Sequence, residues 1–565
     1  MLPVRRLRSN DANQGLLSLL VSLLTLTVFA ALFVFRFLDD NRLTSWHWAF
    51  DQSDIRILVL ALSAGLAGAY AASGVSVPVR AQGPMLFVSA LAATALFWQV
   101  PEVIVDAGRY FTQAKYLELY GPGFFVREWG REIGAWTDLP LLPFLHGVVF
   151  TLFGETRMAI QAFTGLLFAG TVFLTWLIGK TLWDETVGGS AAALLFAMPY
   201  LLVQPALMLV DVPTMFFLTL AIFTTLKAVR EGGIGLLSAA AAITLALLSK
   251  YSTWLMLSIV PVIVLTHFDC GRRIVLRRAA VIALATLVPA GALLLLKFDV
   301  VAAQLKLLWT YQLPGLARWE ESYTSTFLFQ IHPFVTAAAL CGFGAAFVRR
   351  DSKFAVVSWM LLVLAVLGVK RARYILIALP MFALMAGYAL REVTDGRMRR
   401  FIVSCAIVSS LVTAVFGYLP LLKRTSAVNL LAAGEYLNGM TGEVVEVYTL
   451  PQPRSVINPA VAVPILDLFT AKQIIYPGNG MAPPSPEVIA TSPLRFTWEY
   501  DTPSYFRPGP DSSPTSTVAV ITSYRNQPLP ERISARIAGF RLSREFATSD
   551  GIFRFTTLVR VYRAP

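Results

Sequence analysis

The sequence is poor in charged residues and has little cysteine. Lys, Arg, Asp and Glu make up 14% of the 565 residues, whereas hydrophobic residues make up 56% and the mean hydropathy is +0.64. Soluble globular proteins carry about 25% charged residues, so these values exclude an ordinary water-soluble protein. The three cysteines, Cys270, Cys341 and Cys405, lie in or beside apolar segments. A disulfide framework in the polar C-terminal part is therefore excluded, and redox chemistry is disfavoured.

Common motifs of soluble enzymes are also absent. The chain contains no GxxxxGK[ST], GxGxxG, HExxH or paired CxxC, so nucleotide hydrolysis, dinucleotide redox chemistry and zinc-protease chemistry lack their usual sequence patterns. His146, His267 and His332 are too scattered to suggest a metal site. Metal dependence stays open, because Asp and Glu oxygens could hold a divalent cation without a recognisable spacing. No cofactor is certain.

The net charge of +13 does not indicate a nucleic-acid partner. The cations lie in short clusters between apolar runs, which is the pattern that the positive-inside rule produces. We therefore expect membrane lipids, and no nucleic acid, as partners. With a cytoplasmic N-terminus, the clusters on the inner side are Arg5, Arg6 and Arg8; Arg80; Lys180; Lys227 and Arg230; Arg272, Arg273, Arg277 and Arg278; Arg349, Arg350 and Lys353; and Arg397, Arg399 and Arg400.

Apolar segments of membrane-spanning length recur along the chain. A transmembrane helix needs about 20 apolar residues, and about thirteen segments approach this length. The first follows three arginines, has no small-residue cleavage site after it, and is interpreted as a retained signal anchor. The segments cover residues 16–35, 57–77, 85–100, 158–178, 188–207, 213–226, 234–248, 253–265, 279–296, 334–347, 354–369, 374–390 and 401–419.

This topology leaves three polar regions on the outer side, namely residues 101–138, residues 298–332 and everything after residue 420. The last region contains β-rich stretches such as GEVVEVYTL and STVAVITSY between Pro- and Gly-rich turns, which predicts an α/β domain. The predicted organisation is N-terminal transmembrane helices (1–100), a first outer loop with interfacial helices (101–156), the remaining transmembrane core (157–420) and a soluble domain (421–565).

The first outer loop mixes carboxylates with aromatic rings. Asp106, Arg109, Trp136 and Asp138 belong to this mixture. It suits a sugar, because charged groups bind hydroxyls, a pyranose can lie on an aromatic ring, and a carboxylate can take a proton from an acceptor hydroxyl. The alternative is anchoring, since charges and aromatic residues also gather at membrane interfaces without any catalytic role.

A second carboxylate, Asp211, lies between two apolar segments with no room for a long loop. An acid at a membrane boundary is costly, so it needs a partner or a task. The alternative is that Asp211 caps the N-terminus of a helix that starts near Pro213.

Cations on the predicted outer side are unexpected under the positive-inside rule. They are Lys250 and the group Lys370, Arg371 and Arg373, which is followed by Tyr374. Such cations could bind a lipid phosphate or neutralise a phosphate leaving group. The alternative is that they extend towards lipid headgroups without a catalytic role.

The order of these features resembles the GT-C class of membrane glycosyltransferases, specifically the bacterial protein O-mannosyltransferase-like group that includes lipid A aminoarabinose transferase. In that family the first outer loop opens with an acidic motif, usually Asp-Glu, and continues to a His- or Lys-Pro-Pro-Leu element. Here VDAGRYFTQAKYLE places Asp106 at the first acid, and DLPLLPFLHGVVFTLFGE covers the proline element. Ala107 replaces the second acid and Asp138 the basic residue, so a phosphate contact at that residue cannot be carried over.

The resemblance implies an all-α polytopic membrane domain of the GT-C type with about thirteen helices, followed by an extracytoplasmic α/β domain. It implies transfer of a sugar from a polyprenyl-phosphate donor to a glycan, lipid or protein acceptor, with inversion, outside the bacterial plasma membrane. Asp106 would be the catalytic base, and Asp211 would match a second acid. Lys250 and Arg373 with Tyr374 would lie near the donor phosphate. Competing hypotheses are a transporter or flippase and a non-catalytic cell-envelope assembly protein.

Overall fold

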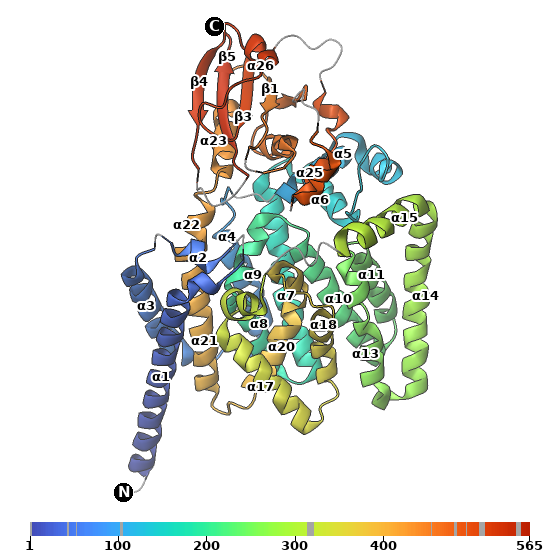
Figure 1. Ribbon diagram of the computed structural model, residues 1–565. Helices are drawn as coiled ribbons and strands as arrows, with labels where there is room; N and C mark the ends of the chain where they lie inside the picture. Colours follow the sequence, from blue (N-terminus) through green and yellow to red (C-terminus); the bar gives the residue numbers. More distant parts are fainter. Residues whose placement is uncertain are drawn as a thin grey trace.

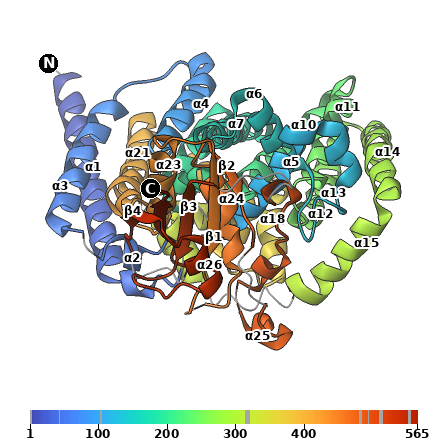
Figure 2. The same ribbon diagram turned by 90° about the horizontal axis from the view of Figure 1, so that it is seen from above.

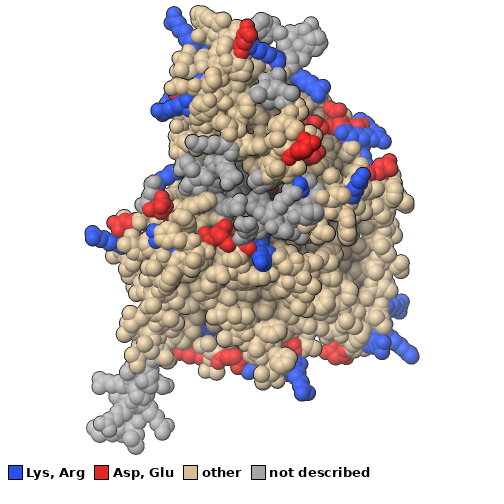
Figure 3. All heavy atoms as spheres, in the orientation of Figure 1, with Lys and Arg blue, Asp and Glu red and all other residues tan. Residues whose placement is uncertain are grey.

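The computed structural model describes residues 3–41, 44–51, 53–101, 105–313, 321–453, 455–478, 483–492, 494–507, 515–549 and 555–565. These residues form a bundle of helices with a small β-sheet on one end (Figure 1). Across the middle of the face in Figure 3, charged side chains are almost absent, whereas charges line the lower edge and the upper part. This distribution fits a helical bundle embedded in lipid.

Seven helical runs in the described part of the chain are long and apolar enough to cross a membrane. An eighth candidate is a pair, Glu185–Ala197 and Pro199–Leu207, bent by 71°. The multi-pass architecture is thus confirmed, while the number of about thirteen crossings stays a prediction. The seven runs lie in α1 (Pro3–Val34), α3 (Ile55–Ser73), α7 (Arg157–Leu182), α10 (Asp211–Glu231), α14 (Arg272–Leu296), α19 with α20 (Ala372–Leu390), and α21 with α22 (Gly396–Leu422).

Shorter helices complete the bundle. Apolar helices of 10–17 residues are Leu141–Phe153, which lies in the predicted first outer loop, and Gly235–Leu247, Ser252–Thr266, Pro333–Arg349 and Phe354–Val366, which correspond to predicted crossings. They are labelled α6, α11, α12 with α13, α17 and α18 in Figure 1. The bent pair consists of α8 (Glu185–Leu194) and α9 (Pro199–Val203) with their 3-10 extensions. Two further helices of the first 100 residues are α2 (Trp46–Ala49) and α4 (Val79–Ala95).

Glycine allows the central helices to approach closely. A Cβ atom at Gly342 of α17 would lie 2.2 Å from the carbonyl oxygen of Met385 in α20, so α17 and α20 touch backbone to backbone at this point. Small residues at helix contacts are the usual solution in lipid, where packing rather than water exclusion drives association. The span that contains α20 is also enclosed by its neighbours, since 89% of its apolar window is buried.

The elements above the bundle carry most of the polar residues. The helix α5 (Val105–Glu128) lies across the top and is kinked at Gly121, which has φ 80°, before Pro122. At the side of the bundle away from α1 and α3, α15 (Phe298–Leu307) follows the upper end of α14 (Figures 1 and 2). It is followed by the π-helical turns Leu308–Gln312 and, further along the chain, Ser325–Ile331.

The C-terminal region contains a five-stranded sheet in the order β2-β1-β3-β5-β4. The strands are β1 (Val444–Thr449), β2 (Gln473–Ile475), β3 (Thr517–Thr522), β4 (Arg541–Phe546) and β5 (Leu558–Arg563). Strand β1 is parallel to β2 and β3, whereas β5 is antiparallel to β3 and β4. Helices α23 (Ala427–Asn438), α24 (Val463–Asp467), α25 (Pro486–Thr491) and α26 (Glu531–Arg536) accompany it, which agrees with the predicted α/β character.

The C-terminal region packs directly on α5. Tyr110 and Phe111 of α5 share one hydrophobic cluster with Leu430 and Val461 of the C-terminal region. At Gly108 a Cβ atom would lie 3.1 Å from the Val461 carbonyl oxygen, so a larger residue would disturb this contact. The helix that carries Asp106 is therefore held between the bundle below and the C-terminal region above.

Candidate active site

Four separate elements bring two acids and two cations together above the bundle. Asp106 comes from α5, Asp211 from the start of α10, Lys250 from the break between α11 and α12, and Arg373 from α19 (Ala372–Ile375). Arg373 bridges both acids, with Nη1 2.5 Å from Asp106 Oδ2 and Nε 2.7 Å from Asp211 Oδ2. Lys250 Nζ lies 2.5 Å from the other oxygen of Asp211. These predicted site residues thus form one continuous ion-pair network.

Asp211 does not act as a helix cap, so that alternative interpretation is wrong. The helix α10 starts at Asp211 itself, its N-cap residue is Val210, and no side chain caps it. The Asp211 side chain is 1% exposed and turns instead towards Lys250 and Arg373. A carboxylate buried this deeply persists only when it is paired and hydrogen-bonded, which both cations provide.

Asp106 is more accessible than Asp211, because 15% of its side chain is exposed. Burial alone would raise the pKa of the Asp106 carboxyl. The charges of Arg373 and Arg109, with the hydrogen bond from Arg373, outweigh burial and hold the pKa below its ordinary value. Asp106 is therefore a carboxylate at neutral pH, which is the form that a proton acceptor requires.

Arg109 and Asp138 form a second pair beside the first. Arg109 lies one helical turn after Asp106, on the same face of α5. It binds Asp138 through two nitrogens, with Nη2 2.8 Å from Oδ1 and Nε 2.7 Å from Oδ2. Gln113 Nε2 also donates to Asp138, at 3.2 Å, and Gln304 Nε2 donates to its backbone carbonyl, at 2.8 Å. Arg109 and Asp138 thus bind each other, and neighbouring elements fix the pair.

Two aromatic rings cover Arg109. Its guanidinium carbon lies 4.8 Å from the centre of the Trp136 ring and 5.7 Å from that of Phe496. The two rings stack on each other with centroids 6.4 Å apart. Trp136 has φ 37°, a conformation that residues other than glycine rarely adopt and that is often found at functional sites. Phe496 lies in the 3-10 helix Arg495–Glu499, so the C-terminal region contributes directly to this site.

Phe496 was not predicted from the sequence. The only signal was an aromatic-rich stretch, LRFTWEY, far along the chain. Nothing in that stretch indicates a contact with Arg109, because the contact arises from the packing of the C-terminal region on α5.

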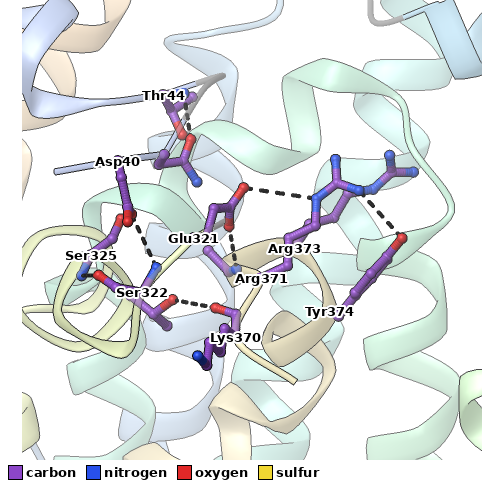
Figure 4. A network of polar contacts seen from close by, with 12 residues as sticks. Asp40, Thr44, Glu321, Ser322, Ser325, Lys370, Arg371, Arg373 and Tyr374 are labelled. Atoms are coloured by element: carbon purple, nitrogen blue, oxygen red, sulfur yellow. Dashed lines mark hydrogen bonds and ion pairs between the residues drawn. The ribbon is translucent and has the colours of Figure 1, made fainter. Parts of the chain in front are cut away.

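The remaining predicted cations differ from one another. Lys370 is exposed, whereas Arg371 and Arg373 are each 8% exposed and are enclosed by protein, which argues against extension towards lipid headgroups. Arg371 Nη1 donates to the Tyr374 hydroxyl at 3.3 Å, and Arg371 Nε lies 3.9 Å from Glu321 Oε1 (Figure 4). Lys250 lies 5.4 Å from the Tyr374 ring centre, so Tyr374 stands between the two cations. Glu321 was another residue that sequence reasoning missed.

A divalent cation has no obvious place in this arrangement. Within the described ranges, no three His, Cys, Asp or Glu side chains lie together as metal ligands would. Between the carboxylates of Asp106 and Asp211 lies the guanidinium of Arg373. These side chains do not form a cation cradle.

Comparisons with known proteins give a matching family model and a similar fold. Residues 138–295 match the family model described as dolichyl-phosphate-mannose-protein mannosyltransferase. The crystal structure of ArnT from Cupriavidus metallidurans bound to undecaprenyl phosphate is similar, with a TM-score of 0.55 over 84% of this chain and 97% of that one, at 11% identity. In fold and in the matched segment, the chain resembles the GT-C class of glycosyltransferases.

Two more solved structures were similar to lesser degrees. The apo state of ArnT from the same organism gives a TM-score of 0.52, with the same coverage and 13% identity. The oligosaccharyltransferase AglB from Archaeoglobus fulgidus gives only 0.41, over 78% of this chain and 69% of that one, at 11% identity. No curated protein matches the chain by sequence. The GT-C resemblance inferred from the sequence is confirmed.

Proposed function

We propose that this GT-C protein transfers a sugar from a polyprenyl-phosphate carrier to a hydroxyl acceptor on the outer face of the plasma membrane. One observation carries the proposal, namely that Arg373 joins Asp106 and Asp211 beside Lys250. A site with a base on one side and cations on the other suits cleavage of a phosphate–sugar bond. The likeness to ArnT, which was crystallised with undecaprenyl phosphate, supports a donor of that chemical class.

Asp106 is the proposed general base. The acceptor hydroxyl gives its proton to the Asp106 carboxylate while its oxygen forms a bond to the sugar C1. The bond from C1 to the phosphate oxygen breaks, and its electron pair leaves with the polyprenyl phosphate. Because the acceptor attacks directly, the configuration at C1 is inverted. The exposed part of Asp106 supports this role, since a base must reach its substrate.

Lys250, Arg371 and Arg373 are the proposed partners of the leaving phosphate, with Lys370 and Tyr374 at the edge of the group. A phosphate that binds Arg373 competes with Asp106 for the same guanidinium. Donor binding would therefore loosen the contact between Arg373 and Asp106 and leave the base free to act. Asp211, with 1% of its side chain exposed, holds Lys250 and Arg373 in place rather than contacting the acceptor.

The acceptor is proposed to approach on the side of Arg109, Trp136 and Phe496. Arg109 lies about one helical turn from Asp106, and the rings of Trp136 and Phe496 cover Arg109. The rings and the guanidinium offer stacking and hydrogen bonds of the kind that sugars use. A glycan, a glycosylated lipid or a protein side chain all present a suitable hydroxyl.

The proposed orientation places the site outside the cell. The turns between α13 (Ile259–Thr266) and α14, between α17 and α18, and between α20 (Leu379–Leu390) and α21 (Gly396–Thr413) lie at the end of the bundle opposite the sheet (Figure 1). Three of the predicted cation clusters lie in these turns or in the helix ends beside them. Clustered cations mark the cytoplasmic side in most membrane proteins, which supports an outer position for α5 and the C-terminal region.

An Asp106→Asn variant tests the proposal. The purified full-length protein is given a panel of undecaprenyl-phosphate sugars and a bacterial envelope extract, and mass spectrometry follows the free undecaprenyl phosphate and the new glycoside. Loss of a general base lowers turnover by about 10²- to 10⁴-fold, and the variant is expected to show this loss. Glu128→Gln, an acid at the end of the same helix, is the matched control.

Two outcomes would overturn the proposal. Full transfer by Asp106→Asn would remove Asp106 from the reaction. Movement of a lipid-linked sugar across proteoliposomes by the unaltered protein, without any new glycosidic bond, would indicate a transporter instead.

A further inference from the structure

The chain segment that follows α1 contains a buried carboxylate, Asp39. Asp39 is 3% exposed. Its Oδ1 accepts hydrogen bonds from Asn41 N at 3.1 Å and Ser325 Oγ at 2.6 Å. Its Oδ2 accepts from Trp46 N and from Gln330 Nε2, both at 2.7 Å. Four donors occupy the acceptor sites of the carboxylate, so Asp39 ties the N-terminal segment firmly to the stretch around Ser325–Ile331.

Two further contacts hold the same stretch. Asp40 Oδ1 accepts from the backbone N of Ser322 at 3.1 Å (Figure 4), and the indole nitrogen of Trp46 donates to the carbonyl of Phe329 at 2.9 Å. The stretch itself is a π-helical turn, an uncommon conformation that is frequent near functional sites. Contacts from the N-terminal segment thus lie at both ends of this turn.

Residues at the start of this stretch contact the segment that contains Lys370 and Arg371. Glu321 Oε2 accepts from the backbone N of Ala372 at 2.9 Å, and Glu321 Oε1 lies 3.9 Å from Arg371 Nε. Thr326 Oγ1 donates to the carbonyl of Lys370 at 3.0 Å. Figure 4 shows Glu321 pointing at the Arg371 guanidinium, with Ser322 and Ser325 on the opposite side of Glu321. The residues directly before Arg373 are therefore held from this side by both backbone and side-chain contacts.

These contacts act on Arg371 and Arg373, the arginines that are proposed to bind the leaving phosphate. Glu321 is 6% exposed, and a buried guanidinium takes its orientation from the carboxylate beside it. Arg373 follows Ala372 directly, and its guanidinium must stay within reach of Asp106 and Asp211. A shift of the backbone at Ala372 would move Arg371 and Arg373 together.

We infer that Asp39 and Glu321 are positioning residues for the donor phosphate, with Asp39 fixing the stretch that carries Glu321, and Glu321 fixing Arg371 and the backbone before Arg373. The inference rests on the proposed function, because it assumes a phosphate at these arginines. It gives the N-terminal helices a role in the reaction, although they precede the catalytic loop and lie at the side of the bundle (Figure 2).

The test measures binding of undecaprenyl phosphate to the purified full-length protein at pH 7.5. Burial raises the pKa of Asp39 to about 6, so this carboxyl is charged at that pH. Glu321→Ala and Asp39→Asn are each expected to weaken binding about tenfold, as for the loss of one charged contact to an anion-binding group. Glu321→Gln should lose less, because its amide oxygen can still accept from Ala372 N.

A matched control separates positioning from general damage. Asp51→Asn makes the same change at an exposed acid in the same N-terminal segment, and its binding constant should equal that of the unaltered protein. Thermal unfolding is recorded for every variant. Damage to the fold alone would lower the unfolding midpoint and the fraction of competent protein, but would leave the dissociation constant of that fraction unchanged.

The outcomes are distinguishable. If the unaltered protein does not bind undecaprenyl phosphate, the proposed donor and this inference both fall. If it binds, but Glu321→Ala and Asp39→Asn bind equally well, only the inference is overturned. Should Asp39→Asn fail to fold, Ser325→Ala removes one of its contacts without changing charge, and unchanged binding by both Ser325→Ala and Glu321→Ala overturns the inference.

Discussion

At the scale of single residues, Arg373 controls the charge on the candidate base. Its guanidinium lies 2.5 Å from Asp106 and 2.7 Å from Asp211. Burial raises the pKa of Asp106, and the charges of Arg373 and Arg109 more than reverse that effect. The protonation state of Asp106 therefore depends on a neighbour that is more than 200 positions away in the sequence.

This dependence predicts a change in the pH profile. In Arg373→Gln the cation is lost while burial remains, so the pKa of Asp106 rises and the carboxylate takes up a proton at higher pH. We expect the acid limb of kcat/KM to move to higher pH in the residual activity of this variant, whereas Arg525→Gln, at an exposed position, should leave it unchanged. An acid limb at the same pH in both variants would show that Arg373 does not set the charge of the base.

The residues of the site were only partly predictable from the sequence. Asp106, Lys250 and Arg373 were found because each is a polar residue in an unusual place, either in an outer loop or on the side where cations are rare. Glu321 and Phe496 could not be found, because each becomes part of the site only through contact with a distant segment. The sequence records which residues are polar, but their partners depend on packing.

At the scale of elements, α5 joins the bundle to the C-terminal region and presents the aromatic pair. Phe496→Ala removes one ring of that pair without touching Asp106. We expect the KM for the acceptor to rise about tenfold, since aromatic stacking contributes about 1 kcal/mol or more. Binding of undecaprenyl phosphate should not change. Tyr524→Ala, at an exposed position of the same region, is the control.

The prediction for Phe496 would be contradicted by a specific pattern of kinetics. An unchanged acceptor KM together with a lower kcat would indicate that the ring supports the fold and not the acceptor.

A second link between α5 and the C-terminal region is ionic. Lys115 Nζ lies 2.9 Å from Glu155 Oε2 and also pairs with Asp467 at the end of α24. Burial raises the pKa of Asp467 to about 7, and Glu155 adds to the rise while Lys115 opposes it. Relative to the ordinary value of 3.8, this shift means that ionisation of Asp467 opposes folding as pH increases towards 7.

Lys115→Met should therefore destabilise the protein most at alkaline pH. Without the cation, Glu155 and Asp467 face each other as unpaired charges, a loss of about 3 kcal/mol for a buried pair. We expect a lower unfolding midpoint by scanning fluorimetry at pH 8 and a smaller deficit at pH 5, where Asp467 is protonated. Lys227→Met, in an exposed pair, is the control. An equal deficit at both pH values would exclude this charge effect.

The elements themselves were predicted better than their boundaries. The apolar run 188–207 was predicted as one helix, but Pro199 starts a new helix after Met198 and the two parts are bent by 71°. The predicted start at residue 85 is also late, because α4 begins at Val79 and includes the polar residues Arg80 and Gln82. Hydropathy locates the lipid-facing part of a helix, whereas caps and prolines set its ends.

At the scale of the whole molecule, the orientation in the membrane is the main open prediction. The native Cys270 is exposed in the turn before α14, on the predicted cytoplasmic side, and Glu531 starts α26 in the C-terminal region. With the other two cysteines replaced by serine, a membrane-impermeant maleimide should label Glu531→Cys in intact cells. Cys270 should react only after permeabilisation. The reverse pattern would invert the topology and place the candidate site in the cytoplasm.

The shared guanidinium of Arg373 has a kinetic consequence. While no donor is bound, Asp106 stays paired with Arg373 and cannot take a proton from an acceptor that arrives first. Release of Asp106 by an arriving phosphate would impose a compulsory order, with donor before acceptor. Initial-rate measurements should then show an acceptor that behaves as the second substrate in an ordered sequential mechanism.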